Sequence, residues 1–356
     1  MLRTIVLAWG LGLVFGCGGR TPLLLGAAPA ATASVSQRDG DAGDASVGNI
    51  FDTRTDRCDG TWLEDRCLVT LVSALAKRSV ITLDADNVYW GSKDILDPIM
   101  AVPKSGGVPV ILAESTRYSH ALDLVVDSFQ VYGVTPDAVL SAPLRGGAID
   151  VVASGIYPNG LAVDSTAVYF TANGSVLKVL KGGGTVVTLA AGQDSEGIAL
   201  DDANVYWVSN RALDLGGVMK VAKNGGAPVA LVSDWRYVFQ PGRIAVDATS
   251  VYCEAYANVT DSGIPNGALM KVAKNGGAVT PLVSIPGWNI PQDVATDGTS
   301  VYWTNEVGDS VMKVLVDGGD PVVLVSGQQD PTYVAVDSTS VYWSTSDGNV
   351  MKLTPK

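Results

Sequence analysis

The chain contains one histidine, His120, and this limits the chemistry that its side chains can perform. A single imidazole cannot build a zinc site with several histidines. It also means that a serine or cysteine nucleophile could use no histidine other than His120 as its general base. We therefore assign no catalytic residue, no metal and no cofactor from the sequence, and we keep His120 as a candidate binding residue.

A recurring aspartate is the most regular polar feature of the chain. Each copy is followed by three residues and then by Val-Tyr. A ring of such carboxylates could serve as metal ligands, but every copy stands at a predicted tight turn, where an Asp side chain bonds to backbone two residues further on. We interpret them as turn-capping residues: Asp84, Asp127, Asp164, Asp201, Asp247, Asp297 and Asp337.

The first residues predict an export signal that ends in a lipidated cysteine. Arg3 precedes an apolar stretch, residues 4–16, that is too short to span a bilayer. Residues 14–17 (VFGC) resemble the lipobox of bacterial lipoproteins, so we expect residues 1–17 to be the signal peptide and lipobox, with Cys17 lipidated. The resemblance also implies an outer-membrane destination, because Gly18 and not Asp follows the cysteine. The alternative is ordinary secretion, with cleavage near residues 28–33.

The other cysteines indicate an oxidising compartment. Cys58 and Cys67 enclose eight residues just before the repeats begin, and this spacing favours a disulfide in a periplasm or at a cell surface. Residues 58–67 are therefore expected to form a disulfide loop. Cys253 stands inside a predicted strand where other repeats have Trp or Phe, and we interpret it as a buried thiol.

The segment between the lipobox and the disulfide loop, residues 18–57, is rich in Ala, Gly, Ser and Asp. It contains too few large apolar groups to offset the entropy of ordering, and we expect a low-complexity linker. The whole chain has a formal net charge of −12 and no basic cluster. A nucleic-acid partner is therefore not expected, because binding to phosphates needs clustered Lys and Arg.

Residues 68–356 consist of seven repeats of about forty residues. Each repeat contains an alternating run before the aspartate, a Val-Tyr run, a third run such as VMKV, and an apolar run after a Gly-Gly or Asn-Gly hairpin. Repeats of four short strands predict an all-β fold, a seven-bladed β-propeller. The last repeat lacks its fourth strand, and residues 68–73 (LVTLVS) match the missing pattern. We expect this N-terminal strand to close the last blade.

The repeats resemble a known group of propellers. Residues 334–337 (VAVD) and 341–343 (VYW) are similar to the bacterial relatives of YWTD (LDL-receptor class B), NHL and TolB-type propellers. Asn305 follows YWT where the YWTD motif has Asp, and seven blades are predicted where that class has six. The resemblance implies a fold but no single function. A similarity to seven-bladed streptogramin-type lyases would imply a catalytic role for His120.

Loop lengths indicate a binding face. Because strands alternate in direction, the loops between blades share one face with the loops between second and third strands, and all length variation falls on that face. Binding residues concentrate on variable loops, and Trp, Tyr and Arg are favoured anchors. The alternative is that these aromatic residues only pack the loops onto the blades. The candidate binding residues are Trp235, Arg236, Tyr237, Tyr256 and Trp288, with Arg117 and His120 at the entry to the second blade.

These features favour a cell-envelope lipoprotein of the outer membrane, or alternatively a secreted or periplasmic protein. Its propeller would be a binding or interaction scaffold for a protein, peptide or glycan, with the membrane reached through the lipid anchor. The alternative is a lyase or hydrolase acting at the channel mouth with Arg117, His120 or Arg243. A third hypothesis is a structural envelope protein without a specific ligand.

Overall fold

The computed structural model describes residues 58–73, 79–92, 98–114, 121–193, 195–209, 217–232, 237–257, 267–285 and 291–356. Within these ranges the side chains of 195, 196, 237–241, 256 and 257 are not described. Residues Thr55–Lys356 form one compact unit, distinct from Met1–Arg54. The predicted signal peptide, the linker and Cys17 lie outside the described residues. Among the described residues, no helix is long and apolar enough to cross a membrane.

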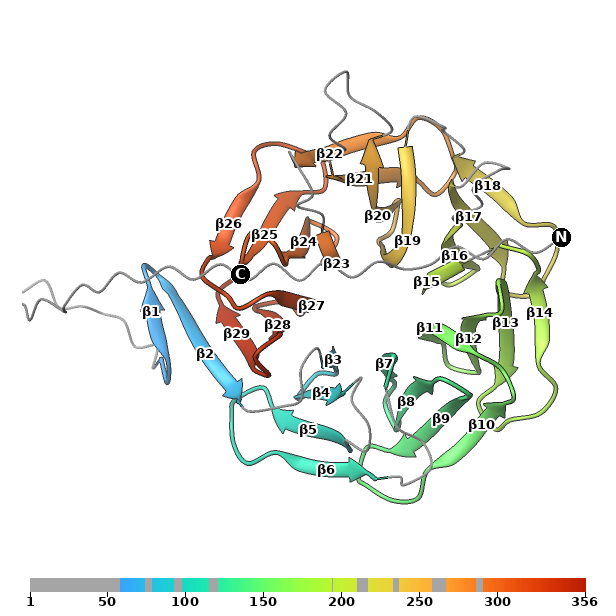
Figure 1. Cartoon of the computed structure of the whole chain (residues 1–356), viewed down its shortest axis with the longest axis horizontal. Coiled ribbons are helices and arrows are strands. Elements are labelled where there is room, and N and C mark those ends of the chain that lie inside the picture. The colour runs from blue at the N-terminus through green and yellow to red at the C-terminus, as the bar shows by residue number, and fades with distance from the viewer. Residues whose placement is uncertain are drawn as a thin grey trace, which may run out of the picture. The chain divides into compact units, whose positions relative to one another are not determined.

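The described chain folds into seven antiparallel sheets arranged in a ring (Figure 1), which confirms the predicted seven-bladed β-propeller. We number these sheets as blades 1 to 7 in chain order and letter the strands of each blade a to d, from the channel to the rim. Blade 1 comprises β3 (Val80–Leu83), β4 (Asn87–Gly91), β5 (Ile99–Pro103) and β6 (Val110–Ala113). Blade 2 comprises β7 (Asp123–Val126), β8 (Gln130–Thr135), β9 (Ala138–Pro143) and β10 (Asp150–Ser154). Blade 3 comprises β11 (Pro158–Val163), β12 (Ala167–Ala172), β13 (Ser175–Leu180) and β14 (Val187–Ala190).

The remaining blades repeat this plan. Blade 4 comprises β15 (Ser195–Leu200), β16 (Asn204–Ser209), β17 (Gly217–Ala222) and β18 (Val229–Val232). Blade 5 comprises β19 (Tyr237–Val246), β20 (Ser250–Ala257), β21 (Gly267–Ala273) and β22 (Thr280–Ile285). Blade 6 comprises β23 (Pro291–Thr296), β24 (Ser300–Asn305), β25 (Ser310–Leu315) and β26 (Val322–Val325). Blade 7 joins β27 (Pro331–Val336), β28 (Val341–Thr345) and β29 (Val350–Thr354) to two strands from the other end of the chain, β2 (Arg66–Val72) and β1 (Thr61–Leu63).

The N-terminal strand closes the ring as the repeat pattern predicts. β2 runs antiparallel to β29, with Leu68 opposite Leu353 and Thr70 opposite Met351. The predicted disulfide between Cys58 and Cys67 is present, but the segment that it closes is not an irregular loop. Because β1 pairs with β2, with Trp62 opposite Cys67, this segment is a hairpin that gives blade 7 a fifth strand.

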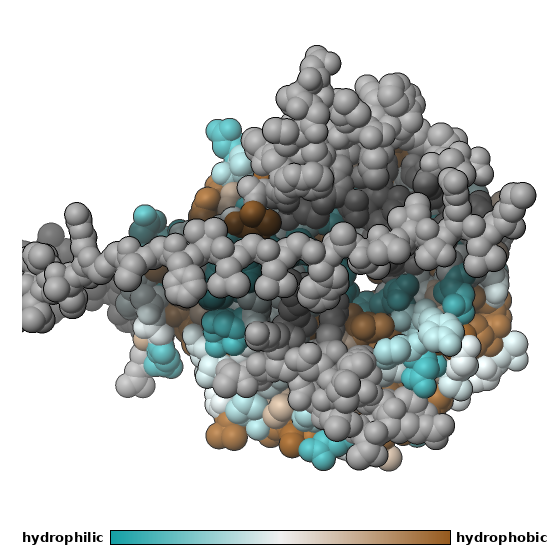
Figure 2. All heavy atoms as spheres, in the orientation of Figure 1, coloured by the Kyte–Doolittle hydropathy of each residue, from teal (hydrophilic) through white to brown (hydrophobic). Residues whose placement is uncertain are grey.

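Neighbouring blades are held together mainly by apolar side chains. The Val-Tyr pair of strand b is at most 2 % exposed in every blade. Buried residues of adjacent blades form clusters around the ring, one of which spans blades 7, 1 and 2. Burial of apolar surface contributes roughly 25 cal/mol per Å² to folding. The rim is less well covered, and Figure 2 shows hydrophobic patches along it, in keeping with half-exposed valines on the outer strands at positions 110, 151, 187, 229 and 322.

Candidate functional site

One repeat position brings charged residues to the central channel. The innermost strands β3, β7, β11, β15, β19, β23 and β27 contact one another in turn around the channel (Figure 1). We call the fourth residue before the turn aspartate of each blade the channel position. It is apolar or small in three blades and polar in four, and its occupants are Val80, Asp123, Gly160, Gly197, Arg243, Asp293 and Tyr333.

Arg243 connects the polar occupants. Its guanidinium reaches from blade 5 to blade 2, where Nη1 lies 2.5 Å from Oδ1 of Asp123. Nε lies 4.0 Å from Oδ1 of Asp293 in blade 6, and Cζ lies 5.0 Å from the centre of the Tyr333 ring in blade 7. The Arg243 side chain is 29 % exposed, whereas that of Asp123 is only 6 % exposed. Arg243 is therefore the more accessible of these two side chains.

Backbone amides fix the two carboxylates. Oδ1 of Asp123 accepts a hydrogen bond from its neighbour Leu124, and Oδ2 accepts one at 2.8 Å from the backbone N–H of Leu161 in blade 3. Asp293 repeats this arrangement, because its Oδ2 accepts a bond of 2.8 Å from the backbone N–H of Val334 in blade 7. Each aspartate thus joins its own blade to the next one and is held in a single orientation.

The cluster has perturbed protonation equilibria. Burial raises the pKa of Asp293 to about 6, although the Arg243 guanidinium and the backbone N–H of Val334 oppose the shift. Burial also acts to lower the pKa of Arg243, but the carboxylates of Asp123 and Asp293 outweigh it and raise that pKa above its usual value. Arg243 is therefore always charged, and the net charge of the channel changes near pH 6 as Asp293 takes up a proton.

Close backbone approach explains one of the small residues at the channel position. A Cβ atom on Gly197 would lie 1.9 Å from the carbonyl oxygen of Gly242 in the next blade. Any side chain there would push blades 4 and 5 apart, so this position has to be glycine.

In the described part of the chain, no group of three or more His, Cys, Asp or Glu side chains is arranged to hold a metal ion. The thiol of Cys253 is fully buried, and burial, with a smaller effect of Glu254, raises its pKa. A protonated and inaccessible thiol is a packing group, as the sequence interpretation supposed.

The recurring aspartates occupy the opposite end of the inner strands, in the turns between strands a and b. In blade 3, Oδ1 of Asp164 accepts hydrogen bonds from the backbone N–H groups of Thr166 and Ala167, at 2.8 and 2.9 Å. This confirms the turn-capping interpretation. Oδ2 has a second role, because it accepts the Tyr169 hydroxyl at 2.9 Å and lies 3.0 Å from Nζ of Lys223 in blade 4.

The second role links one blade to the next at most junctions. We call the ion pair between this aspartate and a lysine at the c–d turn of the following blade the turn-lysine pair. It occurs as Lys104–Asp337, Lys181–Asp127, Lys223–Asp164, Lys274–Asp201 and Lys356–Asp297. The sequence analysis missed these pairs, although the Lys that begins four of the six Gly-Gly hairpins (Lys104, Lys181, Lys223 and Lys274) was a signal that could have revealed them.

A second lysine, on strand c, adds a further link that we call the strand-lysine bond. Its ammonium donates to the carbonyl oxygen of the c–d turn in the next blade. The bonds run from Lys178 to Lys223, from Lys220 to Lys274, from Lys271 to Val316, from Lys313 to Lys356 and from Lys352 to Lys104. Both links lie on the face that carries the a–b and c–d turns, which we call the turn face.

The face opposite the turn face carries the connections between blades and between strands b and c, and we call it the loop face. Trp235, Arg236, Trp288, Arg117 and His120 lie outside the described residues. The backbones of Tyr237 and Tyr256 are described, and they lie in β19 and β20, with Val238 opposite Tyr256. The sequence analysis took both segments for loops, so their strand structure is a correction.

Blade 5 differs from the others at this face. β19 has 10 residues and β20 has 8, whereas the corresponding strands of the other blades have at most 6. The additional pairs extend away from the Asp247 turn, from Phe239 opposite Ala255 to Tyr237 opposite Ala257. The first two strands of blade 5 therefore project on the loop face, and Arg243 lies on the same strand as this projection.

The structure defines the class of the protein as a seven-bladed β-propeller, and comparison with known proteins agrees. No protein family matches the chain by sequence, and no curated protein matches it either. Among solved structures, virginiamycin B lyase from Staphylococcus aureus is similar with a TM-score of 0.64 and 13 % identity, over 81 % of this chain and 98 % of that one.

Two further structures show the same likeness. The WD40 domain of Pan2 from Neurospora crassa has a TM-score of 0.59 and 10 % identity, over 81 % of this chain and 95 % of that one. BamB from Moraxella catarrhalis has a TM-score of 0.50 and 14 % identity, over 81 % of this chain and 91 % of that one. At such identities the likeness concerns the fold. The resemblance to YWTD, NHL and TolB-type repeats stays a prediction.

Proposed function

We propose that the chain is a binding module of the cell envelope that contacts a protein, peptide or glycan partner through the loop face of blades 4 to 6. The observation that supports this most directly is the projection of β19 and β20, since these strands extend on the face that holds the variable loops. A rigid blade that extends into a variable face is a suitable support for recognition residues. Trp235, Arg236, Tyr237, Tyr256 and Trp288 are the proposed contacts, with Arg117 and His120 at the entry to blade 2.

The contrast between the two faces also supports this proposal. On the turn face, the aspartate carboxylates already accept bonds from turn amides, tyrosine hydroxyls and, at most junctions, lysines. Polar groups that are satisfied within the protein gain little from a partner. The described residues of the loop face show no such repeated network, and the repeat does not extend to the loops of that face.

An envelope location is part of the proposal. We propose that the N-terminal signal directs export and that Cys17 carries the lipid that anchors the protein in the outer membrane. Stable anchoring by lipid needs at least two acyl chains or a second membrane contact. The disulfide between Cys58 and Cys67 supports an oxidising compartment, because disulfides persist outside the reducing cytosol.

The test is capture of the partner from envelope extract by the full-length, tagged chain. Replacement of Trp235 and Trp288 by alanine should reduce capture at least about thirtyfold, which corresponds to one hot-spot residue of about 2 kcal/mol. The control is Phe129→Ala, which removes a side chain that is 79 % exposed in a turn on the opposite face. Unchanged capture by the double variant, or an equal loss in Phe129→Ala, would contradict the proposed face.

A second candidate function is a lyase or hydrolase acting at the channel mouth. The observation in its favour is Asp293, whose pKa burial raises to about 6 beside the Arg243 guanidinium. Such a pKa suits a general acid or base at neutral pH. Both oxygens of Asp293, however, accept backbone hydrogen bonds, which is the arrangement of a structural group.

An activity screen separates the two candidates. A turnover that disappears in both Asp293→Asn and His120→Ala would favour the enzyme over the binding module. A turnover that survives both substitutions, or a broad screen without any turnover, would exclude it.

A further inference from the structure

A cavity of about 350 Å³ lies at the place where the ring closes. We call it the closure cavity. It lies between the β1–β2 hairpin, the end of β29 and the turn that follows β5 in blade 1. Its walls carry charged, aromatic and apolar groups, among them Asp59, Trp62, Asp65, Val69, Lys104 and Lys352. A volume of this size is within the range that small-molecule sites occupy.

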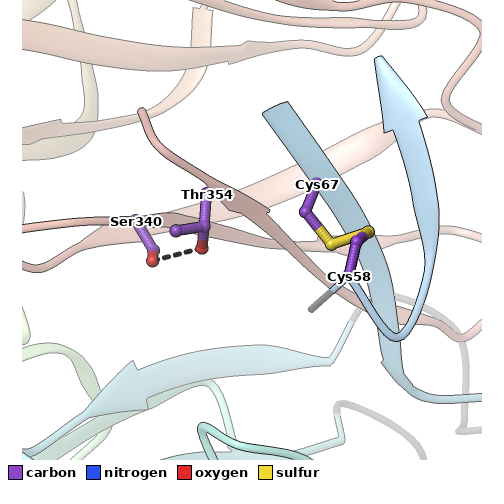
Figure 3. The surroundings of a disulfide bond; sticks show 4 residues. All are labelled: Cys58, Cys67, Ser340 and Thr354. Atoms are coloured by element: carbon purple, nitrogen blue, oxygen red, sulfur yellow. Dashed lines mark hydrogen bonds between the residues drawn. A yellow bond between two sulfur atoms is a disulfide. The ribbon is translucent and has the colours of Figure 1, made fainter. Parts of the chain in front are cut away.

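The cavity exists because blade 7 has a strand that the other described blades lack. The six other sheets have four strands, and only blade 7 adds β1 outside its closing strand. Gly60, just before β1, lies tightly against β2, because a Cβ atom there would lie 2.0 Å from the carbonyl oxygen of Leu68. The disulfide between Cys58 and Cys67 fastens the start of the hairpin to β2, next to Thr354 of β29 (Figure 3). The disulfide therefore holds this wall of the cavity covalently to β2.

Two lysines line the cavity, and they differ in whether they have a carboxylate partner. Lys104 is 11 % exposed and is neutralised by Asp337 at 2.8 Å. Lys352 donates to the carbonyl oxygen of Lys104 at 3.0 Å and lies 5.8 Å from the centre of the Tyr342 ring. Among the described residues, no carboxylate lies within ion-pair distance of the Lys352 ammonium.

Partial burial changes the pKa of Lys352. Burial lowers the pKa of this lysine, and Lys104 adds to the effect while Asp337 opposes it. A partly buried cation without a carboxylate partner favours the approach of an anion, because a charge taken out of water needs compensation.

The outer side of the cavity has the opposite charge. Asp59 and Asp65 are both exposed and flank Trp62, whose side chain is 40 % exposed. Neither carboxylate forms a salt bridge with a described residue. The apolar side chains of Val69 and Leu71 also line the cavity. The lining therefore favours a cation at the two carboxylates and an apolar group beside these side chains.

We propose that the closure cavity binds a small zwitterion of the amino-acid or short-peptide class with an apolar side chain. The ligand carboxylate pairs with the ammonium of Lys352, its ammonium lies between Asp59 and Asp65, and its side chain packs on Trp62 and Val69. A simple anion is repelled by the two carboxylates, and a simple cation leaves Lys352 without a counterion. The site is formed by the hairpin and the c–d turn of blade 1, so it does not depend on the binding face proposed above.

Calorimetric titration of the full chain tests the proposal with defined probes. Phenylalanine and the dipeptide Gly-Phe supply both charges, phenylalanine amide supplies only the cation, and N-acetylphenylalanine supplies only the anion. At least one of the two zwitterions should bind, and each blocked form should bind about tenfold more weakly or not at all. Failure of both zwitterions to bind at 10 mM (on the order of the weakest affinities of specific sites), or equal binding of the amide, would overturn the proposal.

Substitutions then locate the site. Lys352→Met should weaken zwitterion binding about tenfold, and the pair Asp59→Asn and Asp65→Asn should weaken it by a similar factor. The matched control is Lys313→Met, because Lys313 occupies the same position in blade 6 and donates to the carbonyl oxygen of Lys356 at 3.2 Å. Both lysine variants lose one link between blades, but only Lys352→Met should lose affinity. An equal loss in Lys313→Met would mean that a loosened ring, and not the missing ammonium, causes the effect.

Discussion

The junction between blades 3 and 4 and the junction between blades 1 and 2 arise from the same repeat but are held differently. At the first junction, Lys223 pairs with Asp164 and Lys178 donates to the carbonyl oxygen of Lys223. At the second junction, Leu144 and Ala101 occupy the two lysine positions. Among the described residues, Asp84 therefore accepts hydrogen bonds only from its turn amides and the Tyr89 hydroxyl.

The difference shows what the lysines contribute. Leu144 packs against the apolar cluster that spans blades 7, 1 and 2. An ion pair that is partly buried can be replaced by apolar packing with little change in stability, because the pair must first give up its hydration. Two neighbouring blades can therefore be held together either by the turn-lysine pair or by apolar packing at the same position, and this protein has both.

Acidification should produce the largest effect. Although burial acts in the opposite direction, turn amides, tyrosine hydroxyls and lysines lower the pKa of Asp164, Asp201, Asp297 and Asp337. A lowered pKa in the folded state means that the stabilisation is complete above the ordinary pKa of an aspartate and is lost as pH falls below about 4. We expect most of the stability to disappear between about pH 4 and pH 2.

Asp293 should act in the opposite direction at a higher pH. Its pKa is raised to about 6 in the folded state, so the folded protein binds more protons than the unfolded one between about pH 4 and pH 6. Stability should therefore rise as pH falls from 7 to about 5, before the turn aspartates reverse the trend. Urea unfolding as a function of pH measures both limbs, and Asp293→Asn should remove only the rise. A profile that falls steadily from pH 7 would contradict this assignment.

Single substitutions should separate the two junctions. Asp164→Ala removes the turn cap and leaves the Lys223 ammonium, which is 15 % exposed, without its carboxylate. We expect a loss of about 3 kcal/mol, at the low end for a broken buried pair because the groups are partly exposed. Asp84→Ala removes a cap but no ion pair, and should cost about 1 kcal/mol. The free energy of unfolding of both variants checks this, and equal losses would show that the lysine adds nothing.

The smallest effect is expected when the junction between blades 1 and 2 is given the lysine that the junction between blades 3 and 4 has. Leu144→Lys places a lysine opposite Asp84 but removes an apolar contact with the cluster. The net change in the free energy of unfolding should stay within about 1 kcal/mol. The double variant Leu144→Lys with Asp84→Ala should then be less stable than the sum of the single changes predicts. An additive result would mean that the new pair does not form.

The repeat made the architecture predictable. Strand order, blade number and the closing strand at residues 68–73 all followed from a pattern that recurs seven times. The capping role of the turn aspartates also followed, because a cap depends on residues only two or three positions away.

The contacts that the repeat could not reveal join residues far apart in the chain. Asp123 and Arg243 are separated by 120 residues, and only the closed ring brings them together. Strand β1 precedes the repeat and has no counterpart in the other blades. The projection of β19 and β20 replaces what the sequence indicated as loops, because a local pattern does not show where strand pairing ends. The predicted binding residues belong to segments that do not recur from one repeat to the next, so the repeat does not predict their conformation.

The closure in blade 7 has a consequence for chain order. Cys67 lies opposite Thr354, so the first and last segments of the folded ring are neighbours in one sheet. A circular permutant that joins these segments and opens between two other blades would keep every contact described above, as domains with adjacent ends generally allow. The folded ring therefore does not depend on which blade comes first in the amino-acid sequence.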